Sequence, residues 1–175
     1  MDNNILEKYL KAGQIAGKAR ELGASLVVAG MKVEEIADRV EAEIFKLGGD
    51  PAFPVNISLN NIAAHYTPTL GDPLEVGEND HVKIDVGVHI DGYIGDTAVT
   101  VKPSGKDELI ECSEKMLKVA IPLFTHKRRI IEISEAIKGV AKEFGFNPVR
   151  NLTGHGLEQW NVHAVPAIPN VPVSE

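Results

Sequence analysis

The sequence has a single cysteine and no long apolar run, and each shortage excludes a class of protein. A single cysteine, Cys112, excludes an internal disulfide and fits a reducing compartment. It falls in a predicted helix, where we expect it to fill the core. No stretch of about 18 apolar residues occurs, and the N-terminus lacks a basic segment followed by an apolar one. The sequence therefore predicts no membrane partner and a cytoplasmic location.

Positive charge is also scarce in this chain. Eighteen basic residues against 25 acidic ones give a formal net charge of −7. This charge argues against a general electrostatic attraction to nucleic acid. The basic run at residues 126–129 is expected to be a solvated connector. We therefore expect no nucleic acid among the partners.

Length and residue spacing predict one globular domain over residues 1–175. A glycine near residue 23 is expected to stop the first helix, and the last stretch should hold one or two strands. The order of helix pair, hairpin, helix pair and strand is typical of the α+β class. Apolar spacing predicts helices at residues 5–22, 32–49, 107–124 and 133–144, and a hairpin at residues 83–101.

The predicted hairpin carries two carboxylates, Asp85 and Asp96. The dipeptide Asp91-Gly92 is typical of a two-residue type I′ turn, in which both residues need positive φ. With that turn, Asp96 lies opposite Gly87, and the two aspartates share one face on a diagonal of about 7–8 Å. A three-residue loop would instead put them on opposite faces.

Two carboxylates on a half-buried face repel each other and lose hydration, so they need positive charge or hydrogen-bond donors nearby. In one interpretation, Asp85 and Asp96 cap loops or pair with Lys83 or Arg150. In the other, they bind one divalent cation, or two bridged by a carboxylate. The hairpin alone leaves both interpretations open.

The metal interpretation needs a third ligand of another type, and histidines near the hairpin and near the C-terminus are the candidates, although a lone histidine on a strand is more often structural. His155 and His163 lie in "GHGLEQWNVH", and Gly154 and Gly156 suit a site where the backbone bends and a ligand comes close. His65 lies in "NNIAAHYTPT". Imidazole with carboxylate is typical of transition-metal sites rather than of Ca²⁺ or Mg²⁺ sites. The other histidines are interpreted as surface or supporting groups: His81, His89 and His126.

Three segments together resemble a known family. "NNIAAHYTPTLGD", "VKIDVGVHIDGYIGDTAVTV" and "NLTGHGLEQWNVHAVPAIPN" resemble, in order and spacing, the type II methionine aminopeptidases, especially the archaeal ones. The resemblance covers essentially the whole chain. It implies a pita-bread fold, in which two αβ halves are related by a pseudo-twofold axis. It also implies metal-dependent removal of the initiator methionine from new polypeptides.

The resemblance implies a ligand set and a cofactor. Asp85 matches the carboxylate that chelates one metal, Asp96 the one that bridges two metals, and His155 the imidazole ligand of the other metal. The cofactor implied is two divalent ions, and the same oxygen and nitrogen ligands accept Co²⁺, Mn²⁺, Fe²⁺ or Zn²⁺.

The resemblance also implies residues that act on the substrate. His65 matches a catalytic histidine near the substrate amine and the scissile bond. His163 matches a catalytic histidine that hydrogen-bonds the substrate carbonyl. Phe53 matches an aromatic residue of the methionine pocket, although core packing would explain it nearly as well. The substrates implied are nascent polypeptides that start with methionine, and a ribosome contact stays open.

One departure from the family concerns its two glutamate ligands, which come from the second half of the fold. The sequence ends at Glu175 before either would occur, and neither Glu158 nor Glu175 lies in a matching motif. The chain is therefore interpreted as the N-terminal portion of the catalytic domain, with the second half of the fold missing. We expect it to bind metal weakly and to be inactive alone.

Two rival hypotheses accompany this interpretation. Prolidases and aminopeptidases P share the fold and the ligand order, but they lack the "AAHYTP" segment. A non-catalytic pita-bread module that recognises proteins or RNA is the rival from another class. Such modules usually lose ligand positions, whereas Asp85, Asp96 and His155 are all present here.

Overall fold

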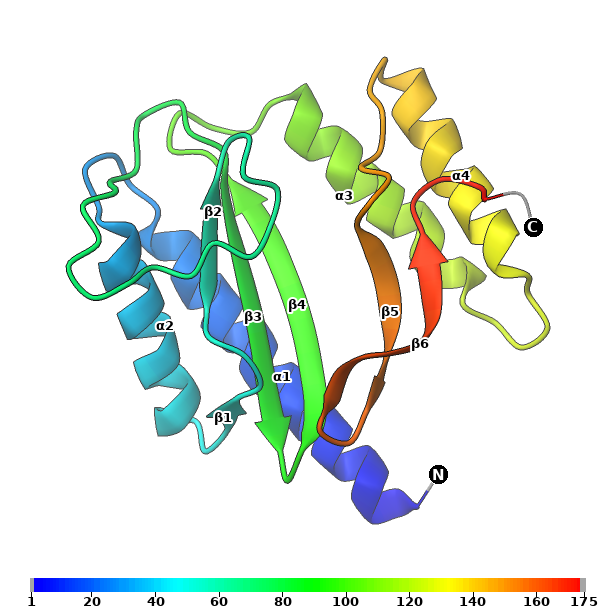
Figure 1. The fold of residues 1–175 in the computed structure, drawn as a ribbon, viewed down its shortest axis with the longest axis horizontal. Helices are drawn as coiled ribbons and strands as arrows, with labels where there is room; N and C mark the ends of the chain where they lie inside the picture. Colours follow the sequence, from blue (N-terminus) through cyan, green and yellow to red (C-terminus); the bar gives the residue numbers. More distant parts are fainter. Residues whose placement is uncertain (1, 174–175) are drawn as a thin grey trace. The chain divides into compact units, whose positions relative to one another are not determined.

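The computed structural model describes residues 2–173, so Glu175 lies outside the described residues. The chain forms two compact units: one holds the residues up to Gly105 together with Leu157–Val162, and the other holds Lys106–Gly156 and the residues from His163 on. Figure 1 labels the elements, which are α1 (Asn3–Leu26), α2 (Val33–Lys46), β1 (Asp50–Pro51), β2 (Asn56–Leu59), β3 (Val82–Ile90), β4 (Tyr93–Val101), α3 (Glu108–Ala120), η1 (Ile121–Leu123), α4 (Ile130–Glu143), β5 (Thr153–Glu158) and β6 (Asn161–Pro169).

The first unit is an antiparallel sheet with two helices on one face. Strand β3 is central: it pairs with β4 along one side and with β2 and β1 along the other. Helices α1 and α2 cover one face of this sheet (Figure 1). Successive side chains of a strand point to opposite faces, so β3 presents one row of side chains to the helices and another away from them.

The helix-facing row of β3 forms the centre of the core. Val82, Ile84, Val86 and Val88 are fully buried, and they belong to one apolar cluster with residues of α1 and α2. Burying each such side chain contributes about 1.5–3 kcal/mol. This row fixes which face of β3 points to the core and, with it, the face on which Asp85 lies.

Helix α1 runs four residues past its predicted end at Leu22, to Leu26, so the predicted stop at the glycine is wrong. The physical reason is that Gly23 packs inside the core rather than ending the helix. A Cβ on Gly23 would lie 3.0 Å from side-chain carbons of Ile84 and Val40. The glycine is there because α1 approaches the sheet closely. Helix α2 confirms the second predicted helix.

The second unit contains two packed helices and most of a two-stranded sheet. Cys112 of α3 is buried against Val140 and Ala141 of α4, as predicted for a core residue. Burial raises the pKa of the Cys112 thiol. Strands β5 and β6 pair with each other, which confirms the strands predicted near the C-terminus.

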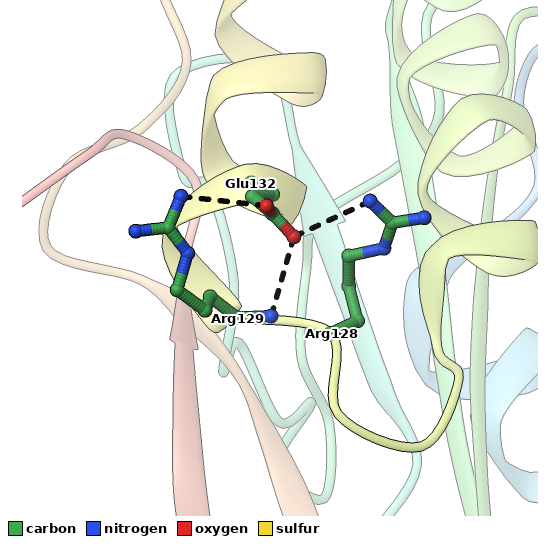
Figure 2. Close-up of polar contacts among 3 residues, drawn as sticks. All are labelled: Arg128, Arg129 and Glu132. Carbon is green, nitrogen blue, oxygen red and sulfur yellow. Dashed lines mark hydrogen bonds and ion pairs between the residues drawn. The ribbon is translucent and has the colours of Figure 1, made fainter.

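Helix α4 begins at Ile130, three residues before its predicted start at Ile133. The carboxylate of Glu132 accepts a hydrogen bond from the backbone N–H of Arg129 at 3.3 Å. It also pairs with the guanidinium groups of Arg128 and Arg129 at 3.3 and 3.4 Å, as Figure 2 shows. These contacts cap the first turn. The basic run at residues 126–129 is exposed, as predicted for a solvated connector.

No helix among residues 2–173 is both long enough and apolar enough to cross a membrane.

Candidate active site

The turn between β3 and β4 sets the register of the two aspartates. Asp91 and Gly92 have φ values of 52° and 84°, as a two-residue type I′ turn requires. Asp85 pairs with Ala98, and Gly87 pairs with Asp96. The predicted register is therefore confirmed, and both half-buried carboxylates lie on the sheet face that points away from the helices. We call this face the aspartate face.

An aromatic ring lies on the aspartate face beside these carboxylates. A Cβ built on Gly87 would lie 2.2 Å from Cε1 and 2.5 Å from Cδ1 of Phe53. Gly87 is directly opposite Asp96, so the ring of Phe53 occupies the space that any larger side chain at position 87 would take. The structure therefore places Phe53, the predicted pocket residue, on the same face as the two predicted metal ligands.

Lys83 lies two residues before Asp85 on β3, on the same aspartate face. Its ammonium group donates a hydrogen bond to the backbone oxygen of Ala63. Burial lowers the pKa of Lys83, and the Coulomb attraction of Asp85 opposes this shift. Lys83 thus supplies part of the positive charge that Asp85 requires, as one of the two initial interpretations held, while its hydrogen bond is directed at the loop before β3.

That loop carries His65. The side chain of His65 is exposed, and its backbone has a φ of 65°, a left-handed conformation that few residues other than glycine adopt. Neighbours of His65 bond to side chains of β2: the N–H of Tyr66 donates to Oγ of Ser58 at 3.2 Å, and Nδ2 of Asn56 donates to Oγ1 of Thr67 at 2.8 Å. The loop around His65 is therefore tied to the sheet.

The β5–β6 hairpin brings two predicted histidines together within the second unit. The rings of His155 and His163 meet edge to face, with centroids 4.6 Å apart and planes at 82°. Nδ1 of His155 lies 3.2 Å from the backbone oxygen of Gly156. When Nδ1 carries the proton and donates to that oxygen, the ring lone pair resides on Nε2, as in many metal-binding histidines.

The two glycines beside His155 differ: a Cβ on Gly154 would make only ordinary contacts, the nearest at 3.4 Å. A Cβ on Gly156 would lie 2.2 Å from the backbone oxygen of Val165, so only glycine allows β5 to approach β6 this closely. The side chain of His155 is half-buried and that of His163 is exposed.

The tip of the β5–β6 hairpin packs on the β3–β4 turn, within the first unit. The N–H of Trp160 donates to the backbone oxygen of Gly92 at 2.9 Å, and Nε2 of Gln159 donates to the backbone oxygen of Asp91 at 2.9 Å. The indole ring lies over Gly92 and meets the ring of His89 edge to face, with centroids 4.8 Å apart. Sequence reasoning did not identify this contact, which joins residues far apart in the chain.

The donor atoms fit a divalent transition metal. Oxygen donors from Asp85 and Asp96 and a nitrogen donor from His155 are the combination that Mn²⁺, Fe²⁺, Co²⁺ and Zn²⁺ accept. Ala98 is opposite Asp85, and the ring of Phe53 fills the space over Gly87, opposite Asp96. Among residues 2–173, however, no three side chains of His, Cys, Asp or Glu are grouped closely enough to hold a metal ion.

Sequence reasoning missed several residues that shape this site. Asn56 and Ser58 are buried polar residues that pair directly with Asp85 and Lys83 across the sheet, and neither was identified as part of a strand. The alternation of Asn and Ser with apolar residues in "VNISL" is the signal that could have identified them as a strand with one polar face.

Comparisons with known proteins place these residues in a family context. Residues 7–174 match the profile of Peptidase_M24, metallopeptidase family M24. A methionine aminopeptidase of Pyrococcus horikoshii is 46% identical over 167 residues, which are 95% of this chain and 57% of that protein. A methionine aminopeptidase of Methanothermus fervidus is 42% identical over 180 residues, covering 95% of this chain and 96% of that protein.

Solved structures agree with the sequence comparison. The crystal structure of a methionine aminopeptidase from Thermotoga maritima superposes with a TM-score of 0.92 at 28% identity, covering 99% of this chain and 73% of that one. The predicted fold class, α+β with a pita-bread fold, is thereby confirmed. The chain spans only 57% of the length of the Pyrococcus relative.

Proposed function

Because this chain belongs to metallopeptidase family M24, we propose that its protein removes the initiator methionine from nascent polypeptides by metal-dependent hydrolysis of the first peptide bond. The observation that carries the proposal is the position of Asp85 and Asp96 on one sheet face. The 46% identity to a protein named methionine aminopeptidase supports the choice of reaction.

Asp85, Asp96 and His155 are the proposed ligands of two divalent ions. The two carboxylates repel each other on a half-buried face, and cations relieve this repulsion. When bound, such ions act as Lewis acids that activate a water molecule at neutral pH. We propose that Asp96 contacts both ions and that His155 contacts one of them.

The remaining residues of the proposed site bind and orient the substrate. His65 contacts the substrate amine, and His163 donates a hydrogen bond to the carbonyl oxygen as negative charge develops on it. Stabilisation of this kind contributes a few kcal/mol (about 3–4) to catalysis. Phe53, whose ring lies over Gly87, supplies an apolar surface for the methionine side chain.

The extent of the domain is part of the same proposal. We propose that both compact units belong to one catalytic domain and that this chain is its N-terminal portion. The proposed location is the cytoplasm, where nascent N-termini emerge. A ribosome contact has no support among residues 2–173 and is left out of the proposal.

The rival hypotheses receive less support. Relatives at 42–46% identity carry the name methionine aminopeptidase, which favours this reaction over those of prolidase and aminopeptidase P. All three proposed ligands in this chain are present, which argues against a binding module without metal.

Release of methionine from the peptide Met-Ala-Ser tests the proposal in a protein extended to the length of the Pyrococcus horikoshii relative. We expect Asp96→Asn to abolish release and to leave the melting temperature in metal-free buffer unchanged or higher, because carboxylate repulsion is relieved. Asp91→Asn, on the turn of the same hairpin, is the matched control and should keep activity. A large loss of stability without metal in Asp96→Asn would instead favour a structural role for Asp96.

A further inference from the structure

Three polar side chains on the aspartate face point to one loop. Asn56 pairs with Asp85 and Ser58 pairs with Lys83 across the β2–β3 ladder. Directly paired residues share a face, and so do residues two apart on one strand. Asn56, Ser58, Lys83 and Asp85 therefore lie on the same face of the sheet.

The first three of these side chains bond to the loop on both sides of His65. Lys83 donates to the backbone oxygen of Ala63, two residues before His65. Ser58 accepts from the N–H of Tyr66 at 3.2 Å, and Asn56 donates to the hydroxyl of Thr67 at 2.8 Å. The bonds thus flank the histidine and leave its own exposed side chain outside them.

The backbone of His65 needs such bonds in order to stay where it is. Its φ of 65° is unfavourable for a residue with a Cβ, and such conformations persist only where the surroundings fix them. An untied loop would release His65 to the ordinary regions of φ and ψ, and the direction of its imidazole would change.

Burial explains why Asn56 and Ser58 are polar. Their side chains are only 6% and 2% exposed, and a buried polar group is costly unless it is hydrogen-bonded. An apolar side chain would fill either position without that cost. Asn56 also donates to the backbone oxygen of Pro54 at 2.9 Å, but the bonds to Tyr66 and Thr67 are the ones that connect these polar groups to the loop.

We propose that Asn56, Ser58 and Lys83 are positioning residues that tie the loop of residues 63–67 to the aspartate face and thereby hold the imidazole of His65 in its working direction. This inference rests on the proposed function, in which His65 contacts the substrate amine. The three residues act through the loop and do not touch the substrate.

Thr67 offers the cleanest test, because its side chain is exposed and its loss should not unfold the chain. Thr67→Val keeps the shape but removes the acceptor of the Asn56 bond. Thr67→Ser keeps the hydroxyl and should behave as the wild type. Thr69→Val, a change of the same kind two residues further along the loop, is the matched control, since the hydroxyl of Thr69 makes no hydrogen bond within residues 2–173.

Two readouts are needed. The first is the ¹⁵N relaxation order parameter of the His65 amide in the 175-residue chain, which we expect to fall from about 0.85 to below about 0.6 in Thr67→Val. The second is release of methionine from Met-Ala-Ser by the protein at the length of its relatives. There Thr67→Val should lower kcat roughly 10- to 100-fold and leave KM nearly unchanged, because binding contacts are kept.

Each outcome decides something. A His65 amide as rigid in Thr67→Val as in the wild type overturns the tether. A mobile His65 with wild-type kcat overturns the positioning role. Equal losses in Thr67→Ser and Thr67→Val would show that shape rather than the hydroxyl matters, and this too overturns the proposal. A wild-type protein that releases no methionine overturns the proposed function alone, and the order parameters still decide whether the tether holds His65.

Discussion

The contact between Gly87 and Phe53 predicts an unusual pair of mutational effects. A Cβ on Gly87 would lie 2.2 Å from the nearest ring carbon, whereas carbon atoms in contact are about 3.5–4.0 Å apart. In Gly87→Ala the ring must therefore retreat by more than about 1 Å. Overpacking of this kind costs about 1–3 kcal/mol of unfolding free energy.

The same substitution should have the opposite effect once the ring is gone. In a Phe53→Ala background the three atoms nearest to the new methyl group are gone, and alanine within a strand is favoured over glycine by about 0.5–1 kcal/mol. The coupling energy between the two positions should therefore be about 1.5–4 kcal/mol.

Urea unfolding of the four proteins, followed by far-ultraviolet circular dichroism, measures this coupling. The cycle comprises the wild type, Gly87→Ala, Phe53→Ala and the double variant. If the two changes are additive within about 0.5 kcal/mol, the ring of Phe53 does not lie on Gly87, and its place on the aspartate face is wrong.

Three further predictions concern other parts of the chain. His163→Ala should lower kcat far more than it lowers metal occupancy, measured by metal analysis of the protein at the length of its relatives; equal losses would make His163 a metal ligand. Gly92→Ala should destabilise the chain more than Gly30→Ala in thermal unfolding. Both glycines have φ near 85°, but only Gly92 lies against the ring of Trp160. Equal losses of stability would refute that contact. Hydrogen bonds from the N–H of Leu74 and the hydroxyl of Tyr66 lower the pKa of Asp72. The stabilising effect of the Asp72 carboxylate is therefore present above the unfolded pKa of about 3.9 and is lost as the pH falls through the lower folded pKa. Asp72→Asn should lose less stability than the wild type between about pH 4 and pH 2. Parallel losses in the two proteins would contradict this.

The sequence was informative where local chemistry decides the structure. Asp91-Gly92 specifies a turn type, and the turn type specifies the register, so the shared face of Asp85 and Asp96 could be predicted without any tertiary contact. The apolar spacing of α2 worked for the same reason, since its periodicity belongs to the helix itself.

Sequence reasoning failed where the role of a residue depends on contact with another residue that local sequence patterns do not reveal. Gly23 resembles a helix stop, but it is glycine because Ile84 and Val40 approach it. The early start of α4 depends on Glu132, whose carboxylate reaches back to Arg129. The contact of Trp160 with Gly92 joins residues far apart in the chain, and no local pattern in "EQWN" indicates it.

The same distinction between predictable and unpredictable features applies to the candidate site. Residue types and motif order were enough to select Asp85, Asp96 and His155. The ties between the sheet and the loop of His65 were not predictable, because they depend on which β2 side chains share a face with Asp85, and that face follows from strand pairing rather than from composition.

Binding of Mn²⁺ to the chain, followed residue by residue through paramagnetic broadening of amide NMR signals, is a direct test of a metal site at Asp85 and Asp96. We expect the signals around these two residues to broaden first at substoichiometric Mn²⁺, and Asp85→Asn and Asp96→Asn each to remove this effect. Broadening that begins elsewhere in the chain, or that survives both substitutions, would contradict a metal site on the aspartate face.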